Sequence, residues 1–192
     1  MHDGIASEMC MDNDQDNQEQ AMIFLTEPSI QYKEQFISAV QEFQREGRQQ
    51  DYDVLHISAD FAKFVQRLQQ EKDRRSVSPG LVPASTFWLI DNTEYIGRLS
   101  LRHKLNDRLL KIGGHIGYEI RPSMRRHGYG QEILRLGLEK ARAFGLSKVL
   151  LTCDEDNIGS KKIIEYNGGQ FENSVEVEGS PKRKLRYWIA IV

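Results

Sequence analysis

The segment RRHGYG, residues 125–130, constrains the fold of this chain more than any other part of the sequence. It follows a strand-like run that stops at Pro122, and it opens an amphipathic, helix-like run over residues 128–144. Glycines at such a junction leave backbone N–H groups unobstructed, at the helix end that carries positive dipole charge. The segment therefore predicts an anion site, and a diphosphate is the usual occupant of such a site.

Two other phosphate-binding motifs are excluded. The segment lacks the Gly-Lys-Ser/Thr ending that a P-loop requires. It also has no third glycine after Gly130 at dinucleotide-fingerprint spacing, and the chain lacks repeated strand–helix–strand units. The remaining alternative is an ordinary glycine-containing turn that caps a helix.

The spacing of apolar residues predicts a fold that contains both helices and strands. Strands are predicted at residues 22–25, 86–90, 95–101, 112–120, 148–152, 171–177 and 184–192, and helices at residues 29–45, after Asp60, at 128–144 and at 158–166. A helix between two strands favours a parallel pair with a right-handed crossover. The sheet should therefore be mixed, with its parallel step across residues 125–130.

The length and composition fit one domain with a real core, because the chain has 192 residues, of which 39% are hydrophobic. Residues 1–20 contain no Lys or Arg and are predicted to be a disordered acidic tail, which leaves residues 21–192 as the single domain. A net charge of −2 argues against a nucleic-acid binder. No apolar run predicts a membrane span, and the distant Cys10 and Cys153 favour a reducing cytoplasm. A homodimer stays open on base rates alone.

Three motifs together resemble the GNAT superfamily of N-acetyltransferases. Arg125, Gly128 and Gly130 fill the fixed positions of its Q/R-x-x-G-x-G/A motif. The preceding IGYEIRPSMRR and the following LLTCDEDNIGSKKIIEYNGGQFE resemble its strand approach and its second signature. The similarity is strongest from residue 112 onward, and it is closest to a group of predicted bacterial acetyltransferases. It implies an α+β, three-layer fold with a mixed, mostly antiparallel sheet that is flanked by helices and splayed between its fourth and fifth strands.

The resemblance implies acetyl-CoA as cofactor, with its diphosphate on backbone N–H groups of residues 126–131. The predicted cofactor-binding residues are Ile120, Arg125, Arg126, His127, Gly128, Tyr129, Gly130, Gln131, Asn157 and Ser160. Alternatives stay open for several of them. The two arginine side chains could be solvated, Ile120 could be a core residue only, and Asn157 could be only a helix cap. No metal ligands are assigned.

The proton donor to the departing thiolate is not evident. In the family it is often a Tyr seven residues after the motif Asn, a position that is Ile164 here. Tyr166 lies nearby, but two further residues along a helix rotate a side chain by about 200°. Tyr166 is therefore only a weak candidate acid. Tyr118 and Cys153 are expected to be packing residues.

The general base is equally open, although a neutral amine is needed for attack on a thioester. His115 and Glu119 lie on one face of the strand that leads into RRHGYG, and both are candidates. The family's frequent Glu position falls at Gly114, so neither role carries over by alignment. Each residue could instead be a hydrogen-bonded or solvated strand residue. Arg102, His103 and Asn106 could line the acceptor pocket or lie on a solvated hairpin.

The sequence thus predicts an acetyl-CoA-dependent N-acetyltransferase that acts by direct attack of a primary amine, on a small molecule or a peptide. The first alternative is a non-catalytic acyl-CoA-binding module, which the missing Tyr at Ile164 favours. The second is a scaffold that acts through the acidic tail.

Overall fold

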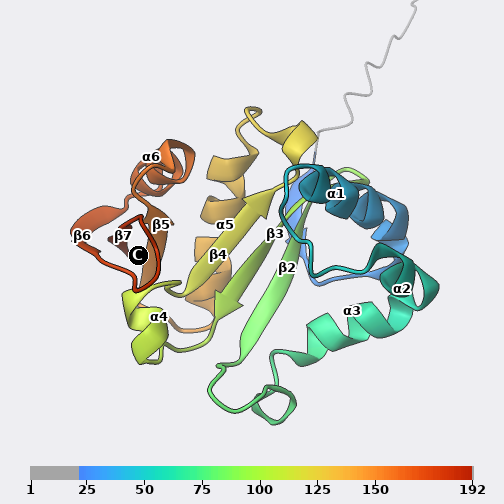
Figure 1. Cartoon of the computed structure of the whole chain (residues 1–192), viewed down its shortest axis with the longest axis horizontal. Coiled ribbons are helices and arrows are strands. Elements are labelled where there is room, and N and C mark those ends of the chain that lie inside the picture. The colour runs from blue at the N-terminus through green and yellow to red at the C-terminus, as the bar shows by residue number, and fades with distance from the viewer. Residues whose placement is uncertain (1–21, 192) are drawn as a thin grey trace, which may run out of the picture.

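The computed structural model describes residues 22–191, which form two β-sheets with helices around them (Figure 1). The strands are β1 (Ile23–Thr26), β2 (Ala84–Asp91), β3 (Glu94–Arg102), β4 (Ile116–Ile120), β5 (Lys148–Asp154), β6 (Gln170–Val175) and β7 (Lys184–Ala190). The helices are α1 (Lys33–Arg45), α2 (Val54–Ala59), α3 (Phe61–Gln70), α4 (Asp107–Lys111), α5 (Tyr129–Ala143) and α6 (Ile158–Tyr166), with 3-10 turns η1 (Ile30–Tyr32), η2 (Arg74–Ser76) and η3 (Pro122–Met124). The acidic tail predicted over residues 1–20 lies outside the described residues.

Two cores lie on opposite faces of the first sheet, which confirms the three-layer arrangement. Trp88 and Ile90 of β2 are buried with the aromatic residues of α1 and α3, whereas Leu89 is buried with α5 and the second sheet. Alternate strand residues point to opposite faces, so β2 is buried on both sides. The helices α1–α3 therefore cover one face, and α5 covers the other.

The sheet is split between β4 and β5. The first sheet has the order β1-β2-β3-β4 and the second the order β5-β7-β6, and every ladder among the described residues is antiparallel. The His115 N–H donates to the Leu150 carbonyl at 2.7 Å, and the Leu150 N–H donates to His115 Nδ1 at 2.9 Å. This link joins the two strands just before β4 begins. The predicted splay is therefore confirmed, but the parallel pair is not a hydrogen-bonded ladder.

Three local differences from the sequence prediction have physical reasons. The fourth strand begins at Ile116 instead of residue 112, because Gly113 and Gly114 adopt φ values of +105° and +60° that break a strand. The helices α2 and α4 were not predicted, since six and five residues are too short for a clear apolar period. The residue before each helix caps it through its side chain: Asp53 accepts from the His56 N–H, and Asn106 accepts from the Leu109 N–H.

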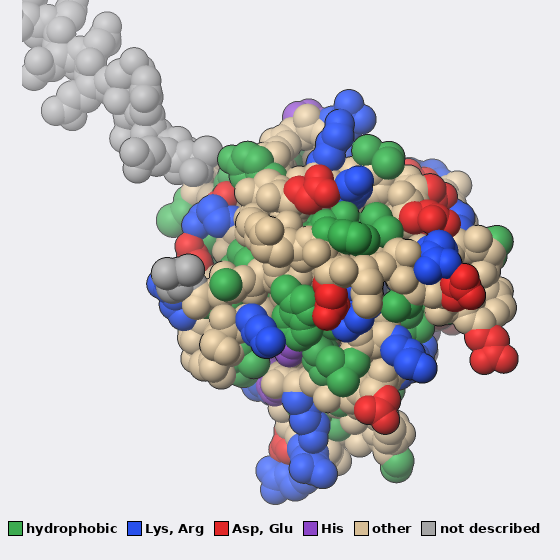
Figure 2. Space-filling model, turned by 90° about the vertical axis from the view of Figure 1, so that its left-hand side faces the viewer, with side chains coloured by type: hydrophobic (Ala, Val, Ile, Leu, Met, Phe, Trp, Pro, Cys, Tyr) green, Lys and Arg blue, Asp and Glu red, His purple; other side chains and the backbone are tan. Residues whose placement is uncertain are grey.

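The surface over the second sheet and α6 mixes side chains of every kind. Basic and acidic groups are interspersed with apolar ones on this face (Figure 2). Ile158, Tyr166 and Phe171 are the large apolar residues exposed from α6 and β6. Within residues 22–191, no helix is both long and apolar enough to cross a membrane.

Candidate active site

A cavity of about 540 Å³ occupies the gap between β4 and β5. Gly117 and Tyr118 line it from β4, and Thr152 and Cys153 line it from β5. The start of α6 closes one side and α4 the other. The edges of both sheets therefore face one partly open cavity.

The backbone of β4 presents polar groups to this gap. The Arg121 N–H donates to the Ile96 carbonyl, and the Arg102 N–H donates to the His115 carbonyl. Because alternate residues of an antiparallel strand face the partner strand, the backbone groups of Tyr118 and Ile120 point away from β3, toward β5. This is the position that the sequence analysis assigned to Ile120.

The loop before α5 is open to an anion. Arg126 and Gly128 have φ values of +71° and +85°, and the residues from Arg126 to Gly128 are exposed. Among the described residues, no side chain caps the N-terminus of α5. The Gln131 N–H donates to the Gly128 carbonyl at 2.9 Å, so the amides that precede Gln131 are the ones left for a ligand.

The two motif glycines are needed for different reasons. At Gly128 the positive φ excludes most side chains, although nothing lies within 4 Å of an added Cβ. At Gly130 an added Cβ would lie 2.5 Å from Ile163 Cδ1, so this glycine lets α6 pack against α5. Gly130 thus has a packing role that the motif alone does not reveal.

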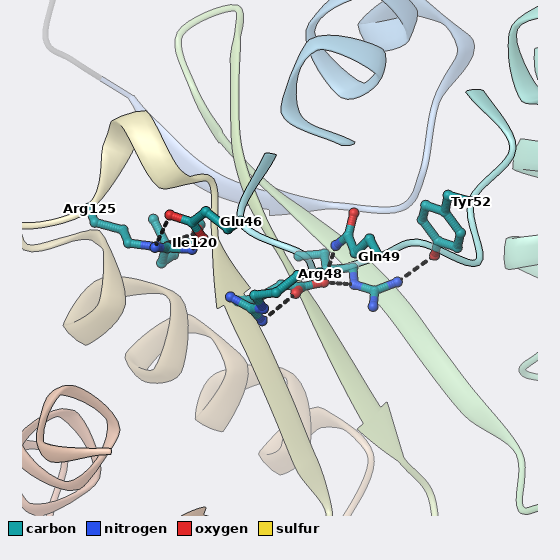
Figure 3. Close-up of polar contacts among 8 residues, drawn as sticks. Glu46, Arg48, Gln49, Tyr52, Ile120 and Arg125 are labelled. Carbon is teal, nitrogen blue, oxygen red and sulfur yellow. Dashed lines mark hydrogen bonds and ion pairs between the residues drawn. The ribbon is translucent and has the colours of Figure 1, made fainter. Parts of the chain in front are cut away.

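Arg125 anchors the loop through its side chain. Its guanidinium donates to both carboxylate oxygens of Glu46 at 2.8 Å, and its Nε donates to the Ile120 carbonyl at 3.2 Å (Figure 3). The side chain therefore joins the loop to α1 and to the end of β4. Arg126 is the exposed arginine of the pair.

Asn157 and Ser160 both line the cavity. Asn157 Oδ1 accepts from the Ser160 N–H at 3.0 Å, so Asn157 does cap α6. The Ser160 hydroxyl lies 3.1 Å from the Tyr118 hydroxyl, which spans the gap from β4 to α6. Tyr118 packs against the core as expected, but its hydroxyl also reaches the cavity, and burial raises the pKa of Tyr118 to about 12.

His115 and Glu119 are not brought together. His115 is buried, and its Nδ1 accepts from β5 in the link described above. Glu119 lies near the other end of β4, where it accepts from Arg98, from Arg48 at 3.0 Å and from Gln49 at 2.7 Å (Figure 3). A second cavity, of about 350 Å³, is lined by Glu119 together with Gly117 and Tyr118.

Glu71 also lines this second cavity, and no sequence motif indicated it. Burial raises the pKa of its carboxyl group, against the opposing charges of Arg67 and Arg98. Glu71 forms no ion pair with any residue of the described chain. Raised pKa values of carboxyl groups in clefts are typical of functional sites.

The remaining candidates lie as follows. Ile164 is fully buried, and Tyr166 is 71% exposed at the end of α6. Cys153 is buried as expected, and burial raises the pKa of its thiol. Arg102 and Asn106 line the first cavity, whereas His103 Nε2 is 2.9 Å from the Ser85 hydroxyl.

The link between His115 and β5 predicts a pH-dependent stability. Burial, followed by the charge of Arg102, lowers the pKa of His115 below its ordinary value. The neutral ring therefore contributes stability above the unfolded-state pKa of about 6.5, and this contribution is lost as the pH falls below it. We expect His115→Ala to lower the free energy of unfolding by about 1–2 kcal/mol at pH 7.5.

Urea unfolding at pH 7.5 and 5.5 measures this effect. The difference between the wild type and His115→Ala should shrink at pH 5.5, while exposed His56→Ala should change little at either pH. An equal difference at both pH values would contradict a neutral His115 acceptor.

Residues 27–170 match the family described as Acetyltransferase (GNAT) domain. The chain belongs to this GNAT acetyltransferase family. The family assignment confirms the resemblance seen in the sequence, and it makes the protein an acetyltransferase with acetyl-CoA as its cofactor. No match was found among curated proteins.

Several solved GNAT structures share the fold. The microcin C7 self-immunity acetyltransferase MccE, in complex with acetyl-CoA and AMP, is 17% identical with a TM-score of 0.61, covering 88% of this chain and 92% of MccE. Mycobacterium smegmatis RimJ, in complex with CoA-disulfide, is 17% identical with a TM-score of 0.67, covering 88% and 82%. The Salmonella typhimurium enzyme that modifies the N-terminal serine of ribosomal protein L7/L12 is 16% identical with a TM-score of 0.61, covering 88% and 95%.

This GNAT acetyltransferase has the features that its cofactor needs. The uncapped start of α5 suits a diphosphate, and the strand edge of β4 suits the amide groups of a pantetheine arm. Within residues 22–191, no cluster of three or more His, Cys, Asp or Glu side chains could hold a metal ion.

Proposed function

We propose that this protein transfers the acetyl group of acetyl-CoA directly to a primary amine of a small molecule or a peptide. The observation that carries the proposal is the cavity between β4 and β5, which shares the lining residues Gly117 and Tyr118 with a second cavity. The first cavity, between β4 and β5, suits the thioester, and the second cavity suits an acceptor. The reacting atoms would then meet at the split in the sheet.

The diphosphate would be held by the backbone amides before Gln131, including those of Arg126, His127, Gly128, Tyr129 and Gly130. Tyr118 and Ile120 would bind the pantetheine arm through their backbone groups, as an added strand is bound. Asn157 and Ser160 would flank the arm from the start of α6. Acetyl-CoA supplies the activated acetyl thioester.

In the transfer, a carbon–nitrogen bond forms and the carbon–sulfur bond breaks. The amine loses a proton, and the sulfur gains one. Glu71 is the carboxylate on the acceptor side that could take up the amine proton, directly or through water. Glu119 lines the same cavity but is the weaker candidate, because it already accepts from Arg98, Arg48 and Gln49. Tyr118, whose hydroxyl is protonated at neutral pH and lies 3.1 Å from the Ser160 hydroxyl, would donate to the sulfur, a role for which Tyr166 is the weaker candidate. His115 is the weaker base candidate because its Nδ1 already accepts from Leu150.

The test is coenzyme A release on mixing the protein with acetyl-CoA and a panel of amines. We expect thiol release with at least one primary amine, together with an acetylated product seen by mass spectrometry. The matched tertiary amine should release none, because it has no proton to lose. Tight acetyl-CoA binding without release for any acceptor would favour the non-catalytic module instead.

A further inference from the structure

Arg102 lies at the junction of the two cavities and lines both of them. Its guanidinium lies over Gly117, since a Cβ added to that glycine would be 3.7 Å from both Nη1 and Nη2. Gly117 precedes Tyr118 in β4, and both residues line the two cavities. The charge of Arg102 is therefore at the centre of the proposed site.

The Arg102 side chain is fixed but only partly used. Its Nη1 donates to the Gly113 carbonyl at 3.0 Å and to the Gly114 carbonyl at 3.1 Å. Neither Nε nor Nη2 has a hydrogen-bond partner within residues 22–191. By contrast, Arg98, which lines the second cavity with Arg102, pairs with Glu119.

Within residues 22–191, no carboxylate forms an ion pair with Arg102, although Glu71 and Glu119 line the second cavity with it. Burial and the neighbouring Arg108 both lower the pKa of Arg102, and no carboxylate opposes them. Arg108 lines the first cavity and forms no ion pair with the described part of the chain. Lys184, the third cation in that lining, is already paired with Asp154 at 2.6 Å. A partly buried guanidinium with free donors and a cationic neighbour is a site for an anion.

We infer that the acceptor carries a carboxylate close to its reactive amine, and that Arg102 binds this carboxylate. The inference rests on the proposed function, because it assigns the second group of the same acceptor. The planar guanidinium group can donate two parallel hydrogen bonds to a carboxylate. Because this group lies over Gly117, near the proposed position of the reacting amine, the amine and the carboxylate of the acceptor should be within one or two residues of each other. The acceptor class is thus an amino acid, or a peptide with an acidic residue at its first positions.

Matched acceptor pairs test the inference. The first pair is an amino acid and its amide. The second pair is two peptides that differ only at the second position, which is Asp in one and Asn in the other. With the wild type we expect kcat/KM to be about 10- to 100-fold higher for the acid of at least one pair, the range that one or two hydrogen bonds to a charged group supply. The pair that shows the preference distinguishes a free amino acid from an acidic peptide.

Three variants test whether Arg102 causes the preference. Arg102→Gln should bring the acid and amide within about twofold of each other, and Arg102→Lys should restore part of the difference because it keeps the charge without the fork. Arg108→Gln, on the exposed surface of α4, should reduce the preference less. Acetyl-CoA affinity, measured by calorimetry, should stay unchanged in all three.

Three results would overturn the inference. Equal wild-type rates for both members of every pair would refute it and leave the transferase function standing. Arg102→Gln weakening acetyl-CoA binding as much as acceptor turnover would assign Arg102 to the cofactor. An absence of transfer to any amine would remove the proposed function itself, and this inference with it.

Discussion

Gly128→Val is expected to weaken acetyl-CoA binding about 100-fold, as the loss of two hydrogen bonds to a charged group would. Gly128 adopts a φ of +85°, which a β-branched side chain disfavours strongly. The loop must therefore change its conformation, and the amides before Gln131 lose their common direction. Calorimetric titration with acetyl-CoA measures the affinity.

The opposite end of the same helix supplies the control. Gly145 has a φ of +78°, and an added Cβ there also meets nothing within 4 Å. Gly145→Val should thus cost similar backbone strain, about 1–3 kcal/mol of unfolding free energy, but leave acetyl-CoA affinity unchanged. Equal losses of affinity in both variants would show that Gly128 acts through stability alone.

Arg121→Leu is expected to lower the free energy of unfolding by about 3–5 kcal/mol, the usual cost of removing one partner from a buried ion pair. Arg121 is only 8% exposed, and it donates to Glu42 at 2.7 Å, to Glu94 at 2.8 Å and to the Ser38 hydroxyl at 2.9 Å. The variant leaves the Glu42 carboxylate, itself largely buried, without its cation. Chemical denaturation of both proteins measures the difference.

The same variant should also disturb the cofactor loop. Glu42 accepts from the Ser123 N–H at 3.0 Å, so α1 holds the chain just before residues 125–130. Arg135 is the control, because its pairs with Glu132 and Glu139 lie on the exposed face of α5. Arg135→Leu should cost less than about 1 kcal/mol. A comparable cost for the two arginines would contradict a buried network at Arg121.

The sequence predicted the long, periodic elements well and the contacts between them poorly. The helix predicted at residues 128–144 is α5, and its apolar residues Ile133, Leu134 and Ala141 are buried. The parallel pair was expected because a helix connects two strands, yet the hydrogen bonds that join the start of β4 to β5 are those of His115 with Leu150 and of Gly113 with Thr152. The order of the strands along the chain follows from the local sequence pattern, whereas the distance between two strands depends on the groups that pack between them.

The candidate site shows the same limit. Local motifs identified Gly128, Asn157 and Ser160, because each lies at a fixed distance from a helix start. Glu71 could not be found, since it comes from α3's end and reaches the second cavity only through the packing of α3 on β2. The Arg125 ion pair with Glu46 spans 79 positions of sequence, and no local pattern indicates such a partner.

The split between β4 and β5 has a consequence for solubility. Each of these strands is the terminal strand of its sheet, and terminal strands elsewhere are templates on which another chain can add and aggregate. Here the two strand edges face each other across the first cavity instead of facing outward. The protein thus keeps the backbone groups of two strand edges unpaired for a narrow ligand, without exposing them on its outer surface to other protein molecules.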